Sequence, residues 1–126
     1  MVVSTSPVAT RVLIVDDDDA VRRGLEFALD VAGFAVETFA SGEALLARAP
    51  PRGRLCMLID ERLPGISGLE TLRQVRARHG MIPAVLVTTH PPLSLREAAA
   101  AAHAPILEKP LIADQVIEAI NAQLDS

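Results

Sequence analysis

Short apolar runs alternate with amphipathic stretches along most of this sequence, and that alternation restricts the folds open to the chain. The runs RVLIVD (Arg11–Asp16) and LCMLID (Leu55–Asp60) are apolar at almost every position, which is typical of strands buried on both faces. In the stretch Asp17–Ala32, apolar residues recur instead at helical spacing. Strands separated by helices predict a parallel sheet with helices on both of its faces.

The alternation predicts five strands and five helices. The expected strands are Arg11–Asp16, Phe34–Phe39, Leu55–Asp60, Ile82–Thr89 and Pro105–Glu108. The first three expected helices are Asp17–Ala32, a short helix that starts at Ser41 and is ended by Pro50 and Pro51, and a helix from Ser67 to Gly80. Ser67 and Glu70 are expected to form a capping box at the start of the third. The last two are Leu95–Ala102, capped by Ser94, and Leu111–Leu124, whose first turn suits Pro110. The fold class is therefore α/β, with a doubly wound parallel sheet.

Composition limits the function classes. A chain of 126 residues, half of them hydrophobic, suits one domain with a real core. Its net charge of −4, from 12 lysines and arginines and 16 acidic residues, argues against direct binding to nucleic acid. No apolar run reaches the roughly 18 residues of a membrane span, no signal peptide is evident, and Cys56 has no partner for an intrachain disulfide. We expect a cytoplasmic domain behind a flexible lead-in, residues 1–10.

Polar residues follow four of the five expected strands. Asp16–Asp19 come after the first strand, Asp60 ends the third, Thr88 lies at the end of the fourth, and Lys109 follows the fifth. The carboxyl ends of parallel strands meet at one edge of the sheet, which is where ligands of open α/β sheets bind. We therefore expect these side chains to lie close together in a candidate site.

The aspartates admit two interpretations. Helix capping accounts for Asp18 and Asp19, since a carboxylate near a helix N-terminus stabilises the helix by about 0.3–1 kcal/mol. Capping leaves Asp60 on a neighbouring strand unexplained, and two carboxylates about 4 Å apart repel by roughly 4 kcal/mol at an effective dielectric of 20. A hard cation such as Mg²⁺ takes oxygen ligands, so we favour a metal-binding acidic cluster over capping alone.

Lys109 and Thr88 extend the chemistry of this edge. A lone lysine is usually solvated, and Thr88 could be an ordinary β-branched strand residue. At this edge, however, Lys109 faces the acidic cluster, which favours an ion pair or the binding of an anion. A lysine beside a metal–carboxylate site suits the neutralisation of a phosphoryl group, and the Thr88 hydroxyl is a suitable donor to a phosphoryl oxygen.

Four motifs follow one another along the chain: VLIVDD (Val12–Asp17), MLIDERLPGISGLE (Met57–Glu70), IPAVLVTT (Ile82–Thr89) and ILEKPL (Ile106–Leu111). In this order they resemble the receiver domain of bacterial two-component response regulators. The resemblance covers Arg11 to Leu124 and implies a flavodoxin-like (βα)₅ sheet with strand order 2-1-3-4-5. Residues 11–126 would then be one receiver domain, either a stand-alone receiver of the chemotaxis-regulator kind or a piece of a longer chain.

The resemblance assigns roles to the acidic residues. It implies that Asp60 is the phospho-acceptor, a carboxylate that forms an aspartyl phosphate. Asp16 and Asp17 match the acidic pair that holds Mg²⁺, and the backbone carbonyl of Arg62 matches the remaining protein ligand besides Asp60. The expected function is a phosphorylation-activated signalling switch that catalyses only its own phosphoryl transfer and slow dephosphorylation, and not a classical enzyme.

The resemblance also implies a switch built on Thr88 and Lys109, which match the residues that bind the phosphoryl group. The peptide bond between Lys109 and Pro110 is expected to be cis. Two positions depart from the family pattern: Thr89 stands where alanine or glycine is usual, and Ile106 where tyrosine or phenylalanine is usual. We expect Thr89 to restrict access or alter the phosphate lifetime, and Ile106 to remove the usual aromatic rotamer switch.

The partner implied by the resemblance is a sensor histidine kinase or a phosphotransfer protein. Phosphorylation would change the surface formed by the last two helices and the strand between them, within Leu95–Leu124. The chain could also form a homodimer through that surface. The loop THPPLS (Thr89–Ser94) loosely resembles receivers of FixJ-type transcription regulators. No direct contact with nucleic acid or with a membrane is expected.

Two other functions compete with this interpretation. A pseudo-receiver would dock partners without phosphorylation, which the departures at Thr89 and Ile106 favour and the intact acceptor-site residues oppose. A haloacid-dehalogenase-like phosphatase would use Asp16 and Asp18 as nucleophile and acid, but it would leave Asp60 without a role. Replacing Asp60 with asparagine separates these functions, because it should abolish receiver phosphorylation and spare a phosphatase.

Overall fold

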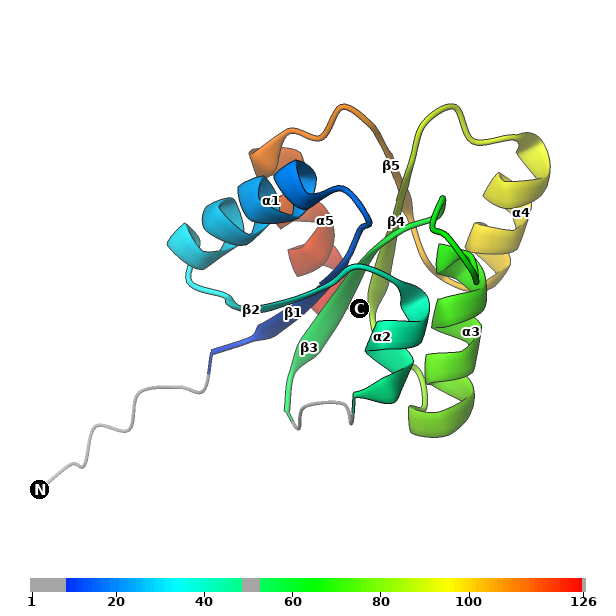
Figure 1. The fold of residues 1–126 in the computed structure, drawn as a ribbon, viewed down its shortest axis with the longest axis horizontal. Helices are drawn as coiled ribbons and strands as arrows, with labels where there is room; N and C mark the ends of the chain where they lie inside the picture. The colour runs from blue at the N-terminus through cyan, green and yellow to red at the C-terminus, as the bar shows by residue number, and fades with distance from the viewer. Residues whose placement is uncertain (1–8, 49–52, 126) are drawn as a thin grey trace, which may run out of the picture.

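The computed structural model describes residues 9–48 and 53–125 and contains a five-stranded parallel sheet (Figure 1). The strands are β1 (Arg11–Val15), β2 (Ala35–Phe39), β3 (Leu55–Asp60), β4 (Ala84–Thr88) and β5 (Ile106–Glu108). Their order across the sheet is β2-β1-β3-β4-β5, which confirms the predicted doubly wound topology. Most of the expected lead-in, residues 1–8, lies outside the described residues, and so do Pro50 and Pro51.

Two layers of helices cover the sheet. The helices are α1 (Asp19–Val31), α2 (Gly42–Ala47), α3 (Gly68–His79), α4 (Leu93–Ala101) and α5 (Ala113–Leu124). As Figure 1 shows, α1 and α5 lie side by side on one face of the sheet, and α2, α3 and α4 lie on the other. Within the described part of the chain, no helix is long and apolar enough to cross a membrane.

The sheet separates two hydrophobic cores. Along β1, Val12 and Ile14 belong to the core beneath α1 and α5, whereas Leu13 and Val15 belong to the core beneath the other three helices. The central strand β3 is buried along its whole length, because helices cover both faces of the sheet. A strand with two buried faces needs an apolar residue at nearly every position, which is why the run Leu55–Asp60 predicts β3 to the residue.

Side-chain caps are present at three helices, and two of them, Asp18 and Ser67, confirm predicted caps. Side-chain oxygens of Asp18, Ser41 and Ser67 accept hydrogen bonds from first-turn amides of α1, α2 and α3. The capping box at Ser67 is half formed: its hydroxyl accepts from the Glu70 amide at 3.1 Å, whereas the Glu70 carboxylate accepts from Gln74. The polar caps therefore mark the starts of these helices.

Three predicted helix starts are wrong. Helix α1 begins at Asp19, two residues after the predicted start at Asp17, because Asp18 is its N-cap. The other two are the starts of α4 and α5. Helix α4 begins at Leu93 with Pro92 as its N-cap, so Ser94 is the second helical residue and caps nothing. Helix α5 begins at Ala113, two residues later than predicted, and Pro110 therefore precedes the helix instead of lying in its first turn. In the described part of the chain, neither start has a side-chain cap. Without a capping side chain, the sequence carries no polar marker of these boundaries.

Candidate functional site

The strand register places the predicted site residues at one edge of the sheet. Val15 of β1 is paired with Ile59 of β3, so Asp16 and Asp60 follow at adjacent strand ends. Thr88 ends the next strand, β4, at the same edge. The fold thus brings together side chains from separate segments, up to 93 positions apart in the sequence.

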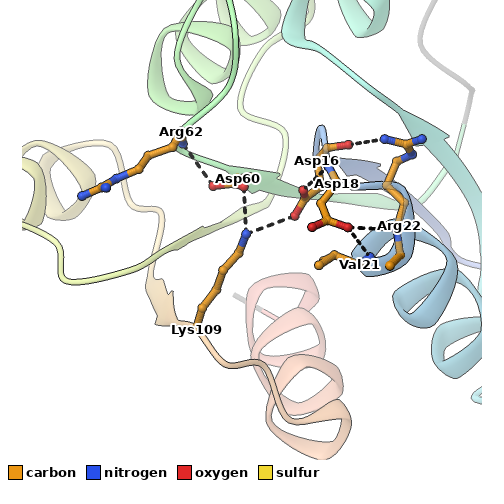
Figure 2. Close-up of polar contacts among 8 residues, drawn as sticks. Asp16, Asp18, Val21, Arg22, Asp60, Arg62 and Lys109 are labelled. Carbon is orange, nitrogen blue, oxygen red and sulfur yellow. Dashed lines mark hydrogen bonds and ion pairs between the residues drawn. The ribbon is translucent and has the colours of Figure 1, made fainter.

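Lys109 links two buried carboxylates, as Figure 2 shows. Its Nζ donates to Asp60 Oδ2 at 2.9 Å and to Asp16 Oδ2 at 3.4 Å. The side chains of Asp16 and Asp60 are only 4% and 6% exposed. Charges shielded from water interact more strongly than charges at the surface, and here one lysine serves two carboxylates. The cluster therefore keeps a surplus of negative charge.

Asp17 completes a group of three carboxylates. One carboxylate oxygen from each of Asp16, Asp17 and Asp60 lies within 4.8 Å of the other two. Asp17 is exposed, and its carboxylate makes no hydrogen bond to any residue that the structure describes. Three hard oxygen donors at this spacing, two buried and one facing solvent, form a donor set that fits Mg²⁺.

The turn after β1 is held by hydrogen bonds to aspartates. Asp16 Oδ1 accepts from the Asp18 amide at 2.9 Å, and Asp18 Oδ1 accepts from the amides of Ala20 and Val21 at 2.9 and 3.1 Å. Asp18 is therefore the N-cap of α1, and Asp19 adds a negative charge to its first turn. Capping and the acidic cluster thus use different members of the same aspartate run.

Burial and neighbouring charges shift two pKa values at this edge. Burial raises the pKa of Asp16; the hydrogen bond from the Asp18 amide lowers it and the charge of Asp60 raises it, with a net upward shift. Burial by itself would lower the pKa of Lys109, but the hydrogen bond to Asp60 and the charges of Asp60 and Asp16 raise it above its ordinary value. Lys109 therefore stays protonated in the site.

The segment after β3 approaches Asp60 closely. The Arg62 amide donates to Asp60 Oδ1 at 3.0 Å, so the two oxygens of this carboxylate have different partners. The Arg62 guanidinium points away from the carboxylates (Figure 2) and donates to the Thr89 carbonyl at 3.3 Å. Gly68 passes so near that a Cβ there would lie 2.4 Å from the Asp60 carbonyl oxygen. This close approach requires glycine and fixes the start of α3 against the end of β3.

Of the predicted switch residues, Thr88 ends β4 at the edge that carries the cluster, Thr89 follows it, and Ile106 begins β5. Thr88 is 1% exposed, and its hydroxyl makes no hydrogen bond to any described residue, so it is free to donate to a new acceptor. Thr89 is half-buried, and Ile106 packs against the core beneath α2, α3 and α4. The peptide bond between Lys109 and Pro110 is cis, as expected.

Sequence reasoning misses Arg22 of α1. Its Nη1 donates to the backbone carbonyl of Asp16 at 2.6 Å (Figure 2), and its Nη2 forms an ion pair with Asp19. The i, i+3 spacing of Asp19 and Arg22 on a helix would have indicated the ion pair. The contact with the Asp16 carbonyl depends on the shape of the turn before the helix, which no periodicity describes.

Comparison with known proteins decides the family. The family model of the response regulator receiver domain matches residues 12–121. The chain belongs to this receiver family. The five-stranded order β2-β1-β3-β4-β5 agrees with the fold that the resemblance implies.

Curated relatives resemble this receiver over most of its length. It is 40% identical over 119 residues to the transcriptional regulatory protein FixJ of Azorhizobium caulinodans, a match that covers 94% of this chain and 56% of that protein. It is 36% identical to the DNA-binding transcriptional regulator NtrC of Klebsiella pneumoniae, over 86% of this chain and 23% of that protein. The receiver thus spans about half the length of this FixJ relative and less of NtrC.

Solved structures share the fold of this receiver. A response regulator receiver domain protein from Methanospirillum hungatei superposes with a TM-score of 0.85 at 28% identity, covering 93% of this chain and 94% of that one. A structure of FixJ-N gives a TM-score of 0.82 at 37% identity, covering 92% of this chain and 94% of that one. These matches confirm the predicted fold class and family.

Proposed function

We propose that this receiver accepts a phosphoryl group on Asp60 from the phosphohistidine of a partner protein and thereby changes its surface. The observation that carries the proposal is the buried Asp60 carboxylate, held on one oxygen by Lys109 and on the other by the Arg62 amide. These contacts orient the carboxylate, while the neighbouring charges of Asp16 and Asp17 leave the site with an excess of negative charge. An oriented carboxylate at a phosphate-binding edge suits nucleophilic attack on phosphorus.

The transfer needs no general base, because the nucleophile is already an anion. An Asp60 oxygen forms the new P–O bond while the P–N bond to the donor imidazole breaks, and the bonding electron pair stays on the imidazole nitrogen. The ring leaves as neutral imidazole when its other nitrogen carries a proton. Lys109, which is already protonated beside Asp60, would then bind an oxygen of the transferred group. The slow hydrolysis of the aspartyl phosphate would return the site to its resting state.

The donor set at this edge supports a site for Mg²⁺. The carboxylates of Asp16, Asp17 and Asp60, with the backbone carbonyl of Arg62, would hold the ion. When bound, it supplies positive charge that offsets the carboxylates and the phosphoryl oxygens. The chain itself orients Asp60 through Lys109 and the Arg62 amide, so the acceptor is positioned before any ion binds.

The Thr88 hydroxyl supports a switch. The residue is 1% exposed, its hydroxyl makes no hydrogen bond to a described residue, and a phosphoryl oxygen on Asp60 would offer it an acceptor. Movement of Thr88 toward Asp60 would shift the loop that leads to α4 and so change the surface of α4, β5 and α5. Thr89 would limit access to the phosphoryl group, and Ile106, which has no ring to rotate, would leave the change to backbone and helix movement.

We propose a sensor histidine kinase or a phosphotransfer protein as the phosphoryl donor and a second copy of this receiver as a candidate partner of the surface of α4, β5 and α5. On that surface Leu93 and Ile112 are 69% and 56% exposed. The names of the relatives describe transcriptional regulators, so in a longer protein this domain, residues 11–126, would control a separate effector without touching nucleic acid itself. We place the domain in the cytoplasm, where such a donor would meet it.

The competing functions are not favoured. The receiver family model covers nearly the whole sheet and its helices, residues 12–121. A haloacid-dehalogenase-like phosphatase would leave Asp60 without a role, yet Asp60 belongs to the carboxylate cluster and accepts a hydrogen bond from Lys109. A pseudo-receiver has no use for an oriented acceptor with a free hydroxyl beside it.

Intact mass after incubation with acetyl phosphate and Mg²⁺ tests the proposal. We expect the parent chain to gain about 80 Da, the Asp60→Asn variant to gain nothing, and EDTA to abolish the gain. An adduct of the same mass on Asp60→Asn would show that another residue is the acceptor. A parent chain that neither gains mass nor binds Mg²⁺ in a titration would be a pseudo-receiver, and phosphatase activity that survives in Asp60→Asn would indicate the dehalogenase-like enzyme.

A further inference from the structure

Arg22 makes an unusual contact for a residue in the first turns of a helix. Its side chain is 18% exposed and bends back from α1 to the turn after β1, as Figure 2 shows. There Nη1 donates to the Asp16 carbonyl at 2.6 Å, while Nη2 is paired with the carboxylate of Asp19. A guanidinium with two donors engaged has a fixed orientation, so it restrains the groups that it binds.

The Asp16 carbonyl belongs to the peptide group that joins Asp16 to Asp17. The Asp16 carboxylate has direct restraints, because it accepts hydrogen bonds from Lys109 and from the Asp18 amide. The Asp17 carboxylate has none among the described residues, so its place in the cluster depends on the backbone that carries it. Arg22 binds that backbone.

We propose that Arg22 is a positioning residue for the cation site: by holding the Asp16–Asp17 peptide, it keeps the Asp17 carboxylate within ligand distance of Asp16 and Asp60. This inference rests on the proposed function, in which the three carboxylates hold Mg²⁺. Arg22 does not itself face the carboxylate oxygens of the cluster; its contact is with the backbone behind them. Residues that orient metal ligands in this way commonly change metal affinity by an order of magnitude or more.

Charge and position predict opposite effects of removing Arg22. A positive charge near a cation site disfavours the cation, so its loss alone would tighten Mg²⁺ binding. Loss of the restraint on the Asp16–Asp17 peptide would weaken Mg²⁺ binding, because binding would then have to order a turn that has lost one of its restraints in the unbound protein. The sign of the change therefore separates a positioning role from a simple charge effect.

Arg23 offers a matched control. It is the next residue of α1, carries the same charge and is exposed. Arg22→Met and Arg23→Met remove the same charge from adjacent positions, whereas Arg22→Lys keeps the charge and loses the two-pronged donor geometry. Calorimetric titration with Mg²⁺ measures the affinity of each folded variant, and far-ultraviolet circular dichroism verifies the fold.

We expect Arg22→Met to bind Mg²⁺ about tenfold more weakly than the parent chain, and Arg22→Lys to lie between them. Arg23→Met should bind as tightly as the parent or slightly more tightly. In the metal-free protein, backbone ¹⁵N relaxation of Asp17 should show greater mobility in Arg22→Met than in Arg23→Met.

The inference is overturned if Arg22→Met binds Mg²⁺ at least as tightly as Arg23→Met, since charge would then account for its effect. If Arg22→Met does not fold, Arg22→Lys decides: parent-like affinity contradicts the positioning role, and weaker binding at unchanged charge supports it. A parent chain that binds no Mg²⁺ contradicts the cation site of the proposed function itself and removes the basis for a role of Arg22.

Discussion

At the scale of single residues, Lys109 balances the charge of the acceptor site. It divides one positive charge between Asp60 and Asp16, at 2.9 and 3.4 Å, where neither carboxylate has much contact with water. Without the lysine, both carboxylates would be buried beside each other with no counter-charge in the metal-free protein. Buried carboxylates in that position repel each other and take up protons.

Lys109→Met should lower the free energy of unfolding by about 2 kcal/mol at neutral pH without Mg²⁺, because it breaks a largely buried ion pair. Urea unfolding followed by circular dichroism measures the loss. The same substitution made in Asp60→Asn should cost clearly less, since only Asp16 then loses its counter-charge. Equal costs in the two backgrounds would show that Lys109 acts through packing of its stem and not through Asp60.

At the scale of elements, helices α3 and α4 lie on the same face of the sheet but are anchored very differently. Helix α3 has a side-chain cap, buries five of its residues and meets the end of β3 through Gly68. Helix α4 starts at Leu93, its N-cap Pro92 makes no side-chain hydrogen bond, and of its nine residues only Ala99 is buried. Elements with few buried contacts change position at the least cost in free energy. Helix α4 is therefore the element best suited to respond when the loop after Thr88 moves.

Two glycine substitutions test the contact between α3 and β3. Gly68→Ala should destabilise the fold by about 2–3 kcal/mol, because the new Cβ would meet the backbone of Asp60 and push α3 away from the strand. Gly24→Ala is the matched control in α1: a Cβ there meets nothing within 4 Å, so alanine should stabilise the helix by about 0.5–1 kcal/mol. Urea unfolding of both variants measures the two effects. A parent-like Gly68→Ala variant would mean that α3 can shift without loss.

The same elements show how far sequence reasoning reaches. The apolar run of β3 and the caps at Asp18 and Ser67 are local signals, and the structure confirms them. The start of α4 carries no such signal, because no side chain caps it in the described structure. Ser94 has the residue type of a cap but lies inside the helix. The gathering of polar residues at one edge follows from parallel topology alone. The contact of Arg22 with the Asp16 carbonyl does not, because it depends on the three-dimensional course of one turn.

At the scale of the whole molecule, an ion-pair cluster ties the edge strand β2 to its neighbours. Glu37 of β2 accepts hydrogen bonds from Arg11 of β1 at 3.3 Å and from Arg48, just after α2, at 2.9 Å. The hydrogen bond from Arg48 lowers the pKa of Glu37, while partial burial opposes the shift and the charges of both arginines add to it. The ionised form is thus favoured in the folded state.

Glu37→Gln should therefore reduce stability by up to about 1 kcal/mol at neutral pH, with a loss that fades in acid. A carboxyl whose pKa is lower in the folded state contributes stability above its unfolded-state pKa, and this contribution is lost as the pH falls through the folded-state value. Urea unfolding of parent and variant from pH 7 down to the acid range measures the difference. Glu118→Gln, which removes an exposed carboxyl of α5 that forms no ion pair among the described residues, controls for the loss of one negative charge.

The sheet that carries the site also partitions the interior. Leu72 of α3 lies in one core and Ile120 of α5 in the other, and both are fully buried. Leu72→Ala and Ile120→Val should each destabilise the fold, and their costs should add within about 0.5 kcal/mol in the double variant, as expected for sites without shared neighbours. If the two cores are energetically independent, mutations could change the surface around α1 to fit a new partner. The packing beneath α3 and α4, on the other face of the sheet, would stay the same, and so would the movement of α4 that it permits.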